Sequence, residues 1–263
     1  MKKVVALFLY PALVYSAEVS NPKPYPSIEY IQERAYGTTV HYVYVKPVHE
    51  LELVVTGSGK RRLSAMITSL ENHEHKNVLV GINGGYFNRE NGDVIGTLIY
   101  HGKHMEKIDF GRVEMGISGN TVSFGYFGEA DPPPFFYLLT AGPYLVKESK
   151  NIARRATGEE DFALDKVDTH PRTAIGKKSD GSLVLVVADG RRRNERGLQL
   201  EELANILLKT GCVEGINFDG GGSSTLVLSG EFYGMTKTEN IVQNNPSDGE
   251  ERKIANGFVV LDK

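Results

Sequence analysis

Alternating apolar and polar residues recur along the chain and predict β-strands. The segments TTVHYVYVKP (38–47) and LELVVTG (51–57) both contain such alternation and predict strands. A period of two is typical of a strand with one buried face. Two more such runs flank KKSDGS (177–182), where Asp180 and Gly181 predict a hairpin turn. Strands therefore dominate the predicted fold.

A helical period is clearest in LQLEELANILLKTG (198–211). Its apolar residues fall on one helical face, and Gly211 suits the C-terminal cap. RLSAMITSLENHE (62–74) predicts a shorter helix, whereas the three prolines at 132–134 predict a loop. Neither an internal repeat nor an interior linker divides the chain. We therefore expect one α+β domain with mixed or antiparallel sheets and a few packed helices.

The first 17 residues have the pattern of a secretory signal peptide. Two lysines precede an apolar stretch over 4–15, and small residues follow at 16 and 17. Residues 18–27 form a Pro-rich spacer, which leaves 28–263 as the folded domain. An uncleaved membrane anchor is the alternative. The signal predicts a secreted, periplasmic or cell-envelope protein with no stable membrane insertion after its removal.

Composition excludes several classes of protein. The net charge of −3 gives no general attraction to nucleic acid. Cys212 is the single cysteine of the 263 residues, so neither an internal disulfide nor a cysteine zinc site can form. Tryptophan is absent, so tyrosines would have to provide any stacking surface for sugars.

The segment GINFDGGGSSTLVL (215–228) is the strongest local signal of a functional site. Asp219 ends an apolar run, and three glycines and two serines follow it before the next run. Consecutive glycines let the backbone approach a ligand closely, and their N–H groups can bind an anion. A plain tight turn needs fewer glycines, so we favour a functional interpretation.

Two other apolar runs end in the same way. Asn83 is followed by glycines 84–85, and Asp189 is followed by Gly190. If these strand ends converge with Asp219, one pocket holds an amide and two carboxylates. Two carboxylates facing one bond are what glycoside hydrolysis usually requires.

Basic residues near these strand ends are candidates for anion binding. Arg172 opens a strand and could hold a phosphate or carboxylate through two parallel N–H bonds, with His170 nearby. Glu195 and Arg196 precede the long helix, whose N-terminus favours anions. Exposed loops are the competing interpretation for each of them.

At these residues the sequence resembles the phosphodiester glycosidase family. The motifs GINGGYFN, TAGPYLV, HPRTAIG, VVADGR, INFDGGGSSTLVL and RKIANGFVV occur in the family's order, from about residue 77 to the C-terminus. The family pattern marks these positions as site residues: Asn83, Gly84, Gly85, Arg172, Asp189, Gly190, Arg196, Asp219, Gly220, Gly221, Gly222 and Ser223.

The resemblance implies cleavage of the glycosidic C–O bond in a sugar-1-phosphodiester. Asp219 and Asp189 would be the catalytic pair, with Asp219 favoured for work at the sugar. The other marked residues would bind the substrate. Together with the predicted export, this points to an N-acetylglucosamine-1-phosphodiester-like carbohydrate in envelope or exopolysaccharide material.

Two alternatives remain at this point. One is a metal-dependent phosphodiesterase that uses Asp189, Asp219 and His170 as ligands. The other is an envelope glycan-binding domain without catalysis. No cofactor is expected, a divalent metal is left open, and the oligomeric state is not indicated.

Overall fold

The computed structural model describes residues 26–56, 59–106, 111–127, 135–160, 168–229, 241–244 and 250–262. The predicted signal peptide, most of the spacer and the three-proline loop lie outside these residues. No helix within the described part of the chain is long and apolar enough to cross a membrane.

A seven-stranded antiparallel sheet forms one layer of the domain. Its strands, in spatial order, are β1 (Ile28–Ala35), β2 (Thr38–Val45), β13 (Leu183–Ala188), β12 (Arg172–Lys177), β14 (Glu214–Asn217), β10 (Tyr144–Lys147) and β11 (Lys150–Asn151). The predicted hairpin is β12–β13, paired from Arg172–Ala188 to Lys177–Leu183. Its turn contains Gly181 in the left-handed region, at φ 85°.

Two five-stranded antiparallel sheets form the rest of the β-structure. The first contains β16 (Ile241–Asn244), β15 (Thr225–Leu228), β4 (Val78–Asn83), β17 (Asn256–Leu261) and β3 (Glu50–Val55) in that order. The second contains β6 (Lys103–Glu106), β5 (Leu98–Tyr100), β9 (Tyr137–Thr140), β7 (Glu114–Ser118) and β8 (Thr121–Gly125).

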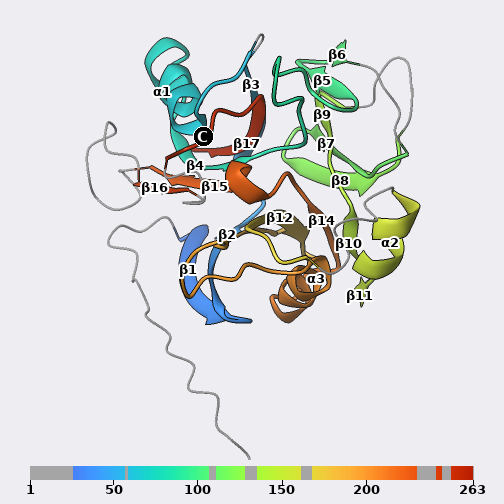
Figure 1. The fold of residues 1–263 in the computed structure, drawn as a ribbon. Helices are drawn as coiled ribbons and strands as arrows, with labels where there is room; N and C mark the ends of the chain where they lie inside the picture. Colours follow the sequence, from blue (N-terminus) through green and yellow to red (C-terminus); the bar gives the residue numbers. More distant parts are fainter. Residues whose placement is uncertain are drawn as a thin grey trace, which may run out of the picture.

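Helices cover the outer faces of two sheets, as Figure 1 shows. α3 (Leu200–Lys209) packs on the seven-stranded sheet, and α1 (Leu63–His73) packs on the sheet that contains β4. The largest cluster of buried apolar side chains draws on all three sheets. Its burial supplies the main driving force for folding.

The elements expected from the long periodic segments are confirmed, including α1, α3 and the β12–β13 hairpin. Gly211 follows α3 at φ 86°, as a C-terminal glycine should. The sequence did not predict the short helix α2 (Ala153–Glu159), which packs against α3 and β10. Seven residues with little apolar periodicity carry no usable signal, so contact with neighbours decides their conformation.

Candidate active site

A small pocket lies where β14 ends and β12 begins. Its volume is about 220 Å³. It is lined by Tyr86, Arg89, His170, Arg172, Arg191, Asp219, Gly220, Gly221, Gly222 and Arg252. Within the described part of the chain, Asp219 is the one carboxylate in this lining. Four arginines and a histidine surround it, so the pocket is built to accept an anion.

Hydrogen bonds from β4 fix the backbone of Asp219. Its N–H donates to the carbonyl of Gly84 at 3.0 Å, and its carbonyl accepts from Asn83 Nδ2 at 2.7 Å. Asn83 is itself held, because its Oδ1 accepts from Thr173 Oγ1 and from the Thr225 N–H. The buried Asn83 amide therefore supports Asp219 from behind the pocket.

The pKa of Asp219 is raised to about 6. Burial is the largest cause, because withdrawal from bulk water disfavours the ionised carboxyl. The Ser223 hydroxyl, Arg252, the Gly220 N–H and Arg89 act in the opposite direction. The Ser223 Oγ is buried and makes no hydrogen bond of good geometry, yet it lies near enough to favour the carboxylate. A carboxyl with this pKa is half ionised near pH 6 and mostly ionised at pH 7.

Arg172 is held rigidly at the start of β12. Its side chain is 2% exposed, and Nε donates to the Leu198 carbonyl at 3.0 Å. Nη2 donates to the Asp168 carbonyl at 3.2 Å. These two hydrogen bonds to backbone carbonyls fix the plane of the guanidinium at the edge of the pocket. A guanidinium fixed before binding loses little entropy when a ligand arrives.

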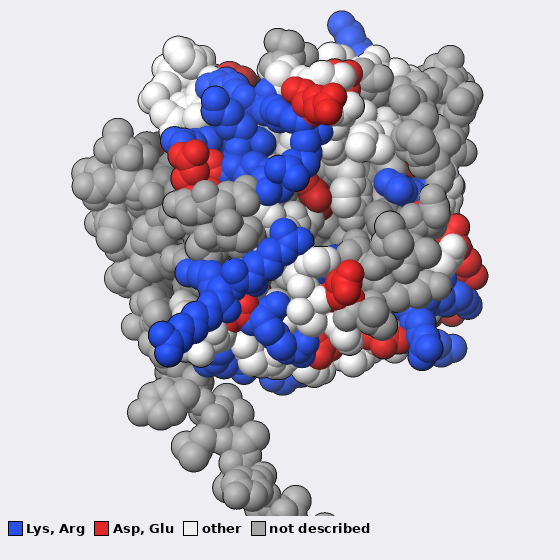
Figure 2. Space-filling view, in the orientation of Figure 1, with Lys and Arg blue, Asp and Glu red and all other residues white. Residues whose placement is uncertain are grey.

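Arg191 enters the pocket from the loop after β13. Its Nη2 donates to Nδ1 of His170 at 2.8 Å, which leaves the ring proton on Nε2. Arg89 and Arg252 complete the ring of charge from other segments. On the face drawn in Figure 2, Lys and Arg gather in two groups, one nearer α1 and one nearer β1 and β2. The overall charge is −3, so positive charge is concentrated locally.

The three glycines after Asp219 form the wall of the pocket. Gly221 has φ 60°, in the left-handed region that side chains disfavour. A Cβ there would lie 3.1 Å from Arg191 Nη1, and one on Gly220 would lie 2.8 Å from the Pro171 carbonyl oxygen. The Gly221 N–H donates to that same carbonyl at 2.9 Å. The glycines therefore let the turn pack directly against β12 and the arginines.

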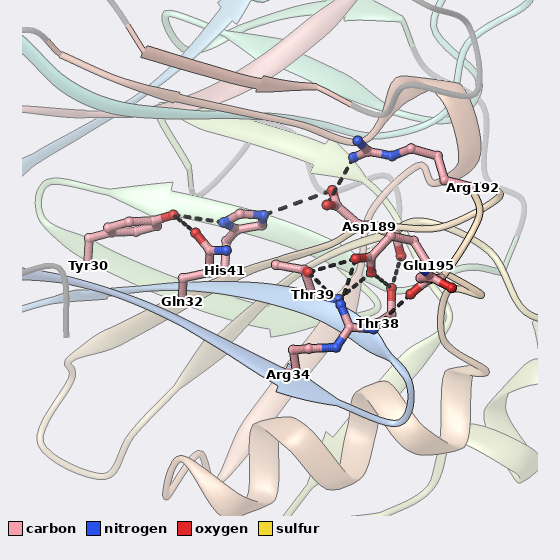
Figure 3. Close-up of polar contacts among 10 residues, drawn as sticks. Tyr30, Gln32, Arg34, Thr38, Thr39, His41, Asp189, Arg192 and Glu195 are labelled. Carbon is pink, nitrogen blue, oxygen red and sulfur yellow. Dashed lines mark hydrogen bonds and ion pairs between the residues drawn. The ribbon is translucent and has the colours of Figure 1, made fainter. Parts of the chain in front are cut away.

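Asp189 does not line this pocket, contrary to the expected convergence of three strand ends. Figure 3 shows its carboxylate between His41 and Arg192. Oδ2 lies 3.0 Å from Arg192 Nη2, and Oδ1 lies 3.9 Å from His41 Nε2. The antiparallel β13 and its continuation carry this residue toward β2, because the Asp189 N–H donates to the Thr39 carbonyl. The ligand set Asp189, Asp219 and His170 is therefore not assembled.

The remaining predicted residues divide between support and pocket lining. Gly84 and Gly85 are buried behind Asp219, where a Cβ would collide with Asn256 and Thr140 respectively. Gly190 packs against Pro171. Arg196 contacts Glu202 and the Tyr36 carbonyl near the start of α3, away from the pocket lining.

Sequence reasoning missed four residues of the lining: Tyr86, Arg89, Arg191 and Arg252. Arg191 and Tyr86 directly follow the strand-end glycines, so the motif itself contained their signal. Arg252 lies in the polar stretch just before β17. Arg89 had no local signal, because only the tertiary structure turns its segment toward Asp219.

No cluster of three or more histidine, cysteine, aspartate or glutamate side chains able to hold a metal occurs among the described residues. The described lining itself offers one carboxyl with a raised pKa, four guanidinium groups, an imidazole and a phenol. Such a set can bind a phosphate and act on an atom next to it.

Comparison with known proteins shows what the chain resembles. The family model described as phosphodiester glycosidase matches residues 76–261. Bovine N-acetylglucosamine-1-phosphodiester alpha-N-acetylglucosaminidase is 33% identical over 165 residues, which are 57% of this chain and 31% of that protein. The prophage-derived uncharacterized protein YomE of Bacillus subtilis is 28% identical over 203 residues, 73% of this chain and 29% of its own length. The chain thus spans less than a third of either relative.

A solved structure shares the fold across nearly the whole chain. The catalytic domain of the zebrafish N-acetylglucosamine-1-phosphodiester alpha-N-acetylglucosaminidase superposes with a TM-score of 0.71 at 21% identity. The match covers 95% of this chain and 88% of that domain.

Proposed function

The chain belongs to the phosphodiester glycosidase family, and on that premise we propose that it hydrolyses the C–O bond of a sugar-1-phosphodiester. One observation carries the proposal. Among the described residues, Asp219 is the single carboxyl in a pocket that is also lined by four arginines and a histidine. In a sugar-1-phosphodiester, the phosphate anion is bonded to the anomeric carbon. The arginines can bind that anion while the Asp219 carboxylate approaches the carbon.

The arginines would bind the phosphate and stabilise it as it leaves. Arg172 is fixed by its two carbonyl partners, and Arg191 is fixed by His170. The glycine turn lines the pocket wall without side chains, so the phosphate can approach its backbone closely. When the bond to the anomeric carbon breaks, its electron pair passes to the phosphate oxygen. Fixed positive groups near that oxygen stabilise the negative charge that develops on it in the transition state, and this lowers the barrier.

Asp219 would act on the sugar side in its ionised form. It either assists the attack of water or attacks the anomeric carbon itself, after which water completes the hydrolysis. The products are a free sugar, with the water oxygen on its anomeric carbon, and a phosphomonoester. A phosphate leaving group needs little help from a general acid. One carboxylate in the pocket therefore suffices, where glycoside hydrolysis usually needs two.

The substrate proposed is an N-acetylglucosamine-1-phosphodiester in cell-envelope or exopolysaccharide material. The printed name of the bovine relative supports the sugar and the linkage. The signal-like residues 1–17 support export. Tyr86 supports a sugar beside the phosphate, because it is the aromatic side chain in the lining and its hydroxyl is held by the Gly142 carbonyl at 2.9 Å.

Hydrolysis of the methyl phosphodiester of N-acetylglucosamine 1-phosphate in water enriched in heavy oxygen tests the proposal. We expect the label in the sugar, because the C–O bond breaks. Label in the phosphate would mean P–O cleavage and would overturn the proposal. Bound but unhydrolysed substrate, with equal affinity for wild type and Asp219→Asn, would instead indicate a binding domain.

A further inference from the structure

The loop between β13 and α3 carries four arginines, of which one reaches the pocket. We call residues 189–196 the arginine loop. Arg191 and Asn194 have positive φ, at 56° and 70°. A residue with a side chain stays in this backbone region only where surrounding contacts hold it. Arg192 and Glu195 exchange two backbone hydrogen bonds of 3.1 and 3.0 Å, so the loop is a tight reversal.

Glu195 anchors one end of the loop to the β1–β2 hairpin. Its carboxylate accepts from the Thr39 N–H at 2.6 Å and from Thr39 Oγ1 at 2.9 Å. It also accepts from Thr38 Oγ1 at 2.8 Å and from Arg34 Nη1 at 2.7 Å. Figure 3 shows these contacts converging on Glu195. Burial alone would raise the pKa of Glu195, but these hydrogen bonds lower it below its usual value. A carboxylate with this many donors is firmly placed.

Asp189 anchors the other end of the loop. Its carboxylate pairs with Arg192, three residues further along, and faces Nε2 of the buried His41 at 3.9 Å. His41 is fixed on its other side, where Nδ1 lies 2.8 Å from the Tyr30 hydroxyl. The Thr38 hydroxyl lies 2.8 Å from the Asp189 backbone carbonyl as well as from Glu195, so its single proton is shared between these two acceptors. Both ends of the loop are thus fastened to the same hairpin.

Pairing within and around the loop leaves Arg191 for the pocket. Arg192 is matched by Asp189, and Arg196 is matched by Glu202. Arg191 instead contacts His170 and lies against Gly221, so its charge meets no carboxylate in these contacts.

We propose that Glu195 and Asp189 are positioning residues that hold the arginine loop on the β1–β2 hairpin and thereby place Arg191 against the substrate phosphate. This inference rests on the proposed function of the same pocket. It assigns Asp189 a role outside the chemical step, and it gives the β1–β2 hairpin, far away in sequence, a part in phosphate affinity.

The effect of losing an anchor follows from the population of the correct loop conformation. If one molecule in ten holds Arg191 in place, the apparent dissociation constant rises about tenfold. Glu195→Gln keeps the size of the side chain but removes its charge, and the amide nitrogen cannot accept the hydrogen bonds that one carboxylate oxygen accepts. We therefore expect a higher KM for the phosphodiester and a kcat within about twofold of wild type.

Binding of inorganic phosphate, measured by calorimetry, provides the decisive test in a double-mutant cycle. Glu195→Gln should weaken phosphate about tenfold, but should have no further effect in an Arg191→Ala background. Glu159→Gln is the matched control, because this exposed glutamate pairs only with Arg155 among the ion pairs described and should stay within twofold of wild type. Unchanged phosphate affinity in Glu195→Gln, or an equal loss in the Arg191→Ala background, would overturn the inference.

A milder variant keeps the test valid if Glu195→Gln folds poorly. Arg34→Gln removes one donor to Glu195 from a side chain that is 54% exposed. It should weaken phosphate about two- to threefold, again only when Arg191 is present. Equal weakening without Arg191 would contradict the inference.

Phosphate binding also separates this inference from the proposed function. If the phosphodiester is not hydrolysed but the coupling between Glu195 and Arg191 is measured, the proposed function fails and the inference stands. If hydrolysis occurs without that coupling, the inference fails and the proposed function stands.

Discussion

Two strand ends of the seven-stranded sheet have the same local sequence pattern and different roles. After β14 the chain reads Asp219-Gly-Gly-Gly, and after β13 it reads Asp189-Gly-Arg. Asp219 lines the pocket, whereas Asp189 pairs with Arg192 beside the β1–β2 hairpin. The first carboxyl is placed to act on a ligand, and the second holds the loop that delivers Arg191.

Neighbouring segments cause this difference. The turn at Asp219 packs against the end of β4. There the Gly84 carbonyl and the Asn83 amide bind the Asp219 backbone, and the carboxyl faces the arginines of the pocket. The turn at Asp189 packs against β2, whose Thr39 carbonyl accepts a hydrogen bond from the Asp189 N–H. An aspartate followed by glycine at a strand end is therefore a signal of close packing. Which group enters the pocket depends on the strand that the turn meets.

The largest expected effect separates the two aspartates directly. Asp219→Asn should lower kcat roughly 10³-fold, because an amide can neither activate water nor attack the anomeric carbon. Asp189→Asn should raise KM several-fold and leave kcat within about threefold, because it acts only through the arginine loop. Steady-state kinetics on the methyl phosphodiester would measure both.

Phosphate affinity is the control for that pair of variants. Asp219→Asn should bind inorganic phosphate at least as tightly as wild type, since it removes a negative charge from the pocket. The different roles assigned to the two aspartates would be contradicted if Asp189→Asn lowered kcat as much as Asp219→Asn does.

The glycines that follow the two aspartates should differ next. Gly221→Val should reduce activity roughly 100-fold, because its Cβ would meet Arg191 at the pocket wall and its φ is left-handed. Gly190→Val should mainly reduce folding stability, since its Cβ would lie 2.6 Å from the Pro171 nitrogen. Activity per folded molecule, with thermal unfolding measured alongside, distinguishes the two effects. Equal losses of activity and stability in Gly221→Val would make this turn purely structural.

The pH dependence should follow Asp219 alone. Since its pKa is about 6 and the ionised form is active, kcat/KM should fall about tenfold per pH unit below 6 and level off above it. Asp189→Asn should keep the same break in the profile. A rate that rises as the pH falls through 6 would instead make Asp219 a general acid.

The smallest effect expected is on stability. The pKa of Asp219 is higher in the folded protein than its ordinary value of 3.8, so protonation stabilises the fold. This contribution is complete below pH 3.8 and is lost as the pH rises through 6. At pH 7.5, Asp219→Asn should therefore unfold at a higher temperature than wild type, by about 2–4 °C for each kcal/mol.

Two comparisons check that prediction by calorimetric melting. The higher melting temperature of Asp219→Asn should disappear near pH 4, where the folded wild type carries a protonated Asp219 that is as neutral as the asparagine. Asp189→Asn should show no such gain, because it removes an ion pair of small net value. A lower melting temperature for Asp219→Asn at pH 7.5 would contradict the assigned direction of the pKa shift.

Regular elements were predictable wherever one segment contained its whole signal. The apolar face and terminal glycine of 198–211 identified α3, and the alternating runs around Asp180-Gly181 identified the β12–β13 hairpin. The candidate site was predictable in part, because the glycines beside Asp219 and the position of Arg172 are marked locally. Arg89 could not be identified, since its sequence neighbours resemble any exposed loop.

The sequence by itself determined an α+β domain, its family and Asp219 as the leading candidate for chemistry, because these depend on patterns within single segments. Only the tertiary structure decided that Asp189 lies outside the pocket and that Arg89 and Arg252 line it. The physical reason is that the seven-stranded sheet and the sheet containing β4 bring distant strand ends together. A side chain's environment is then set by the strand its turn packs against.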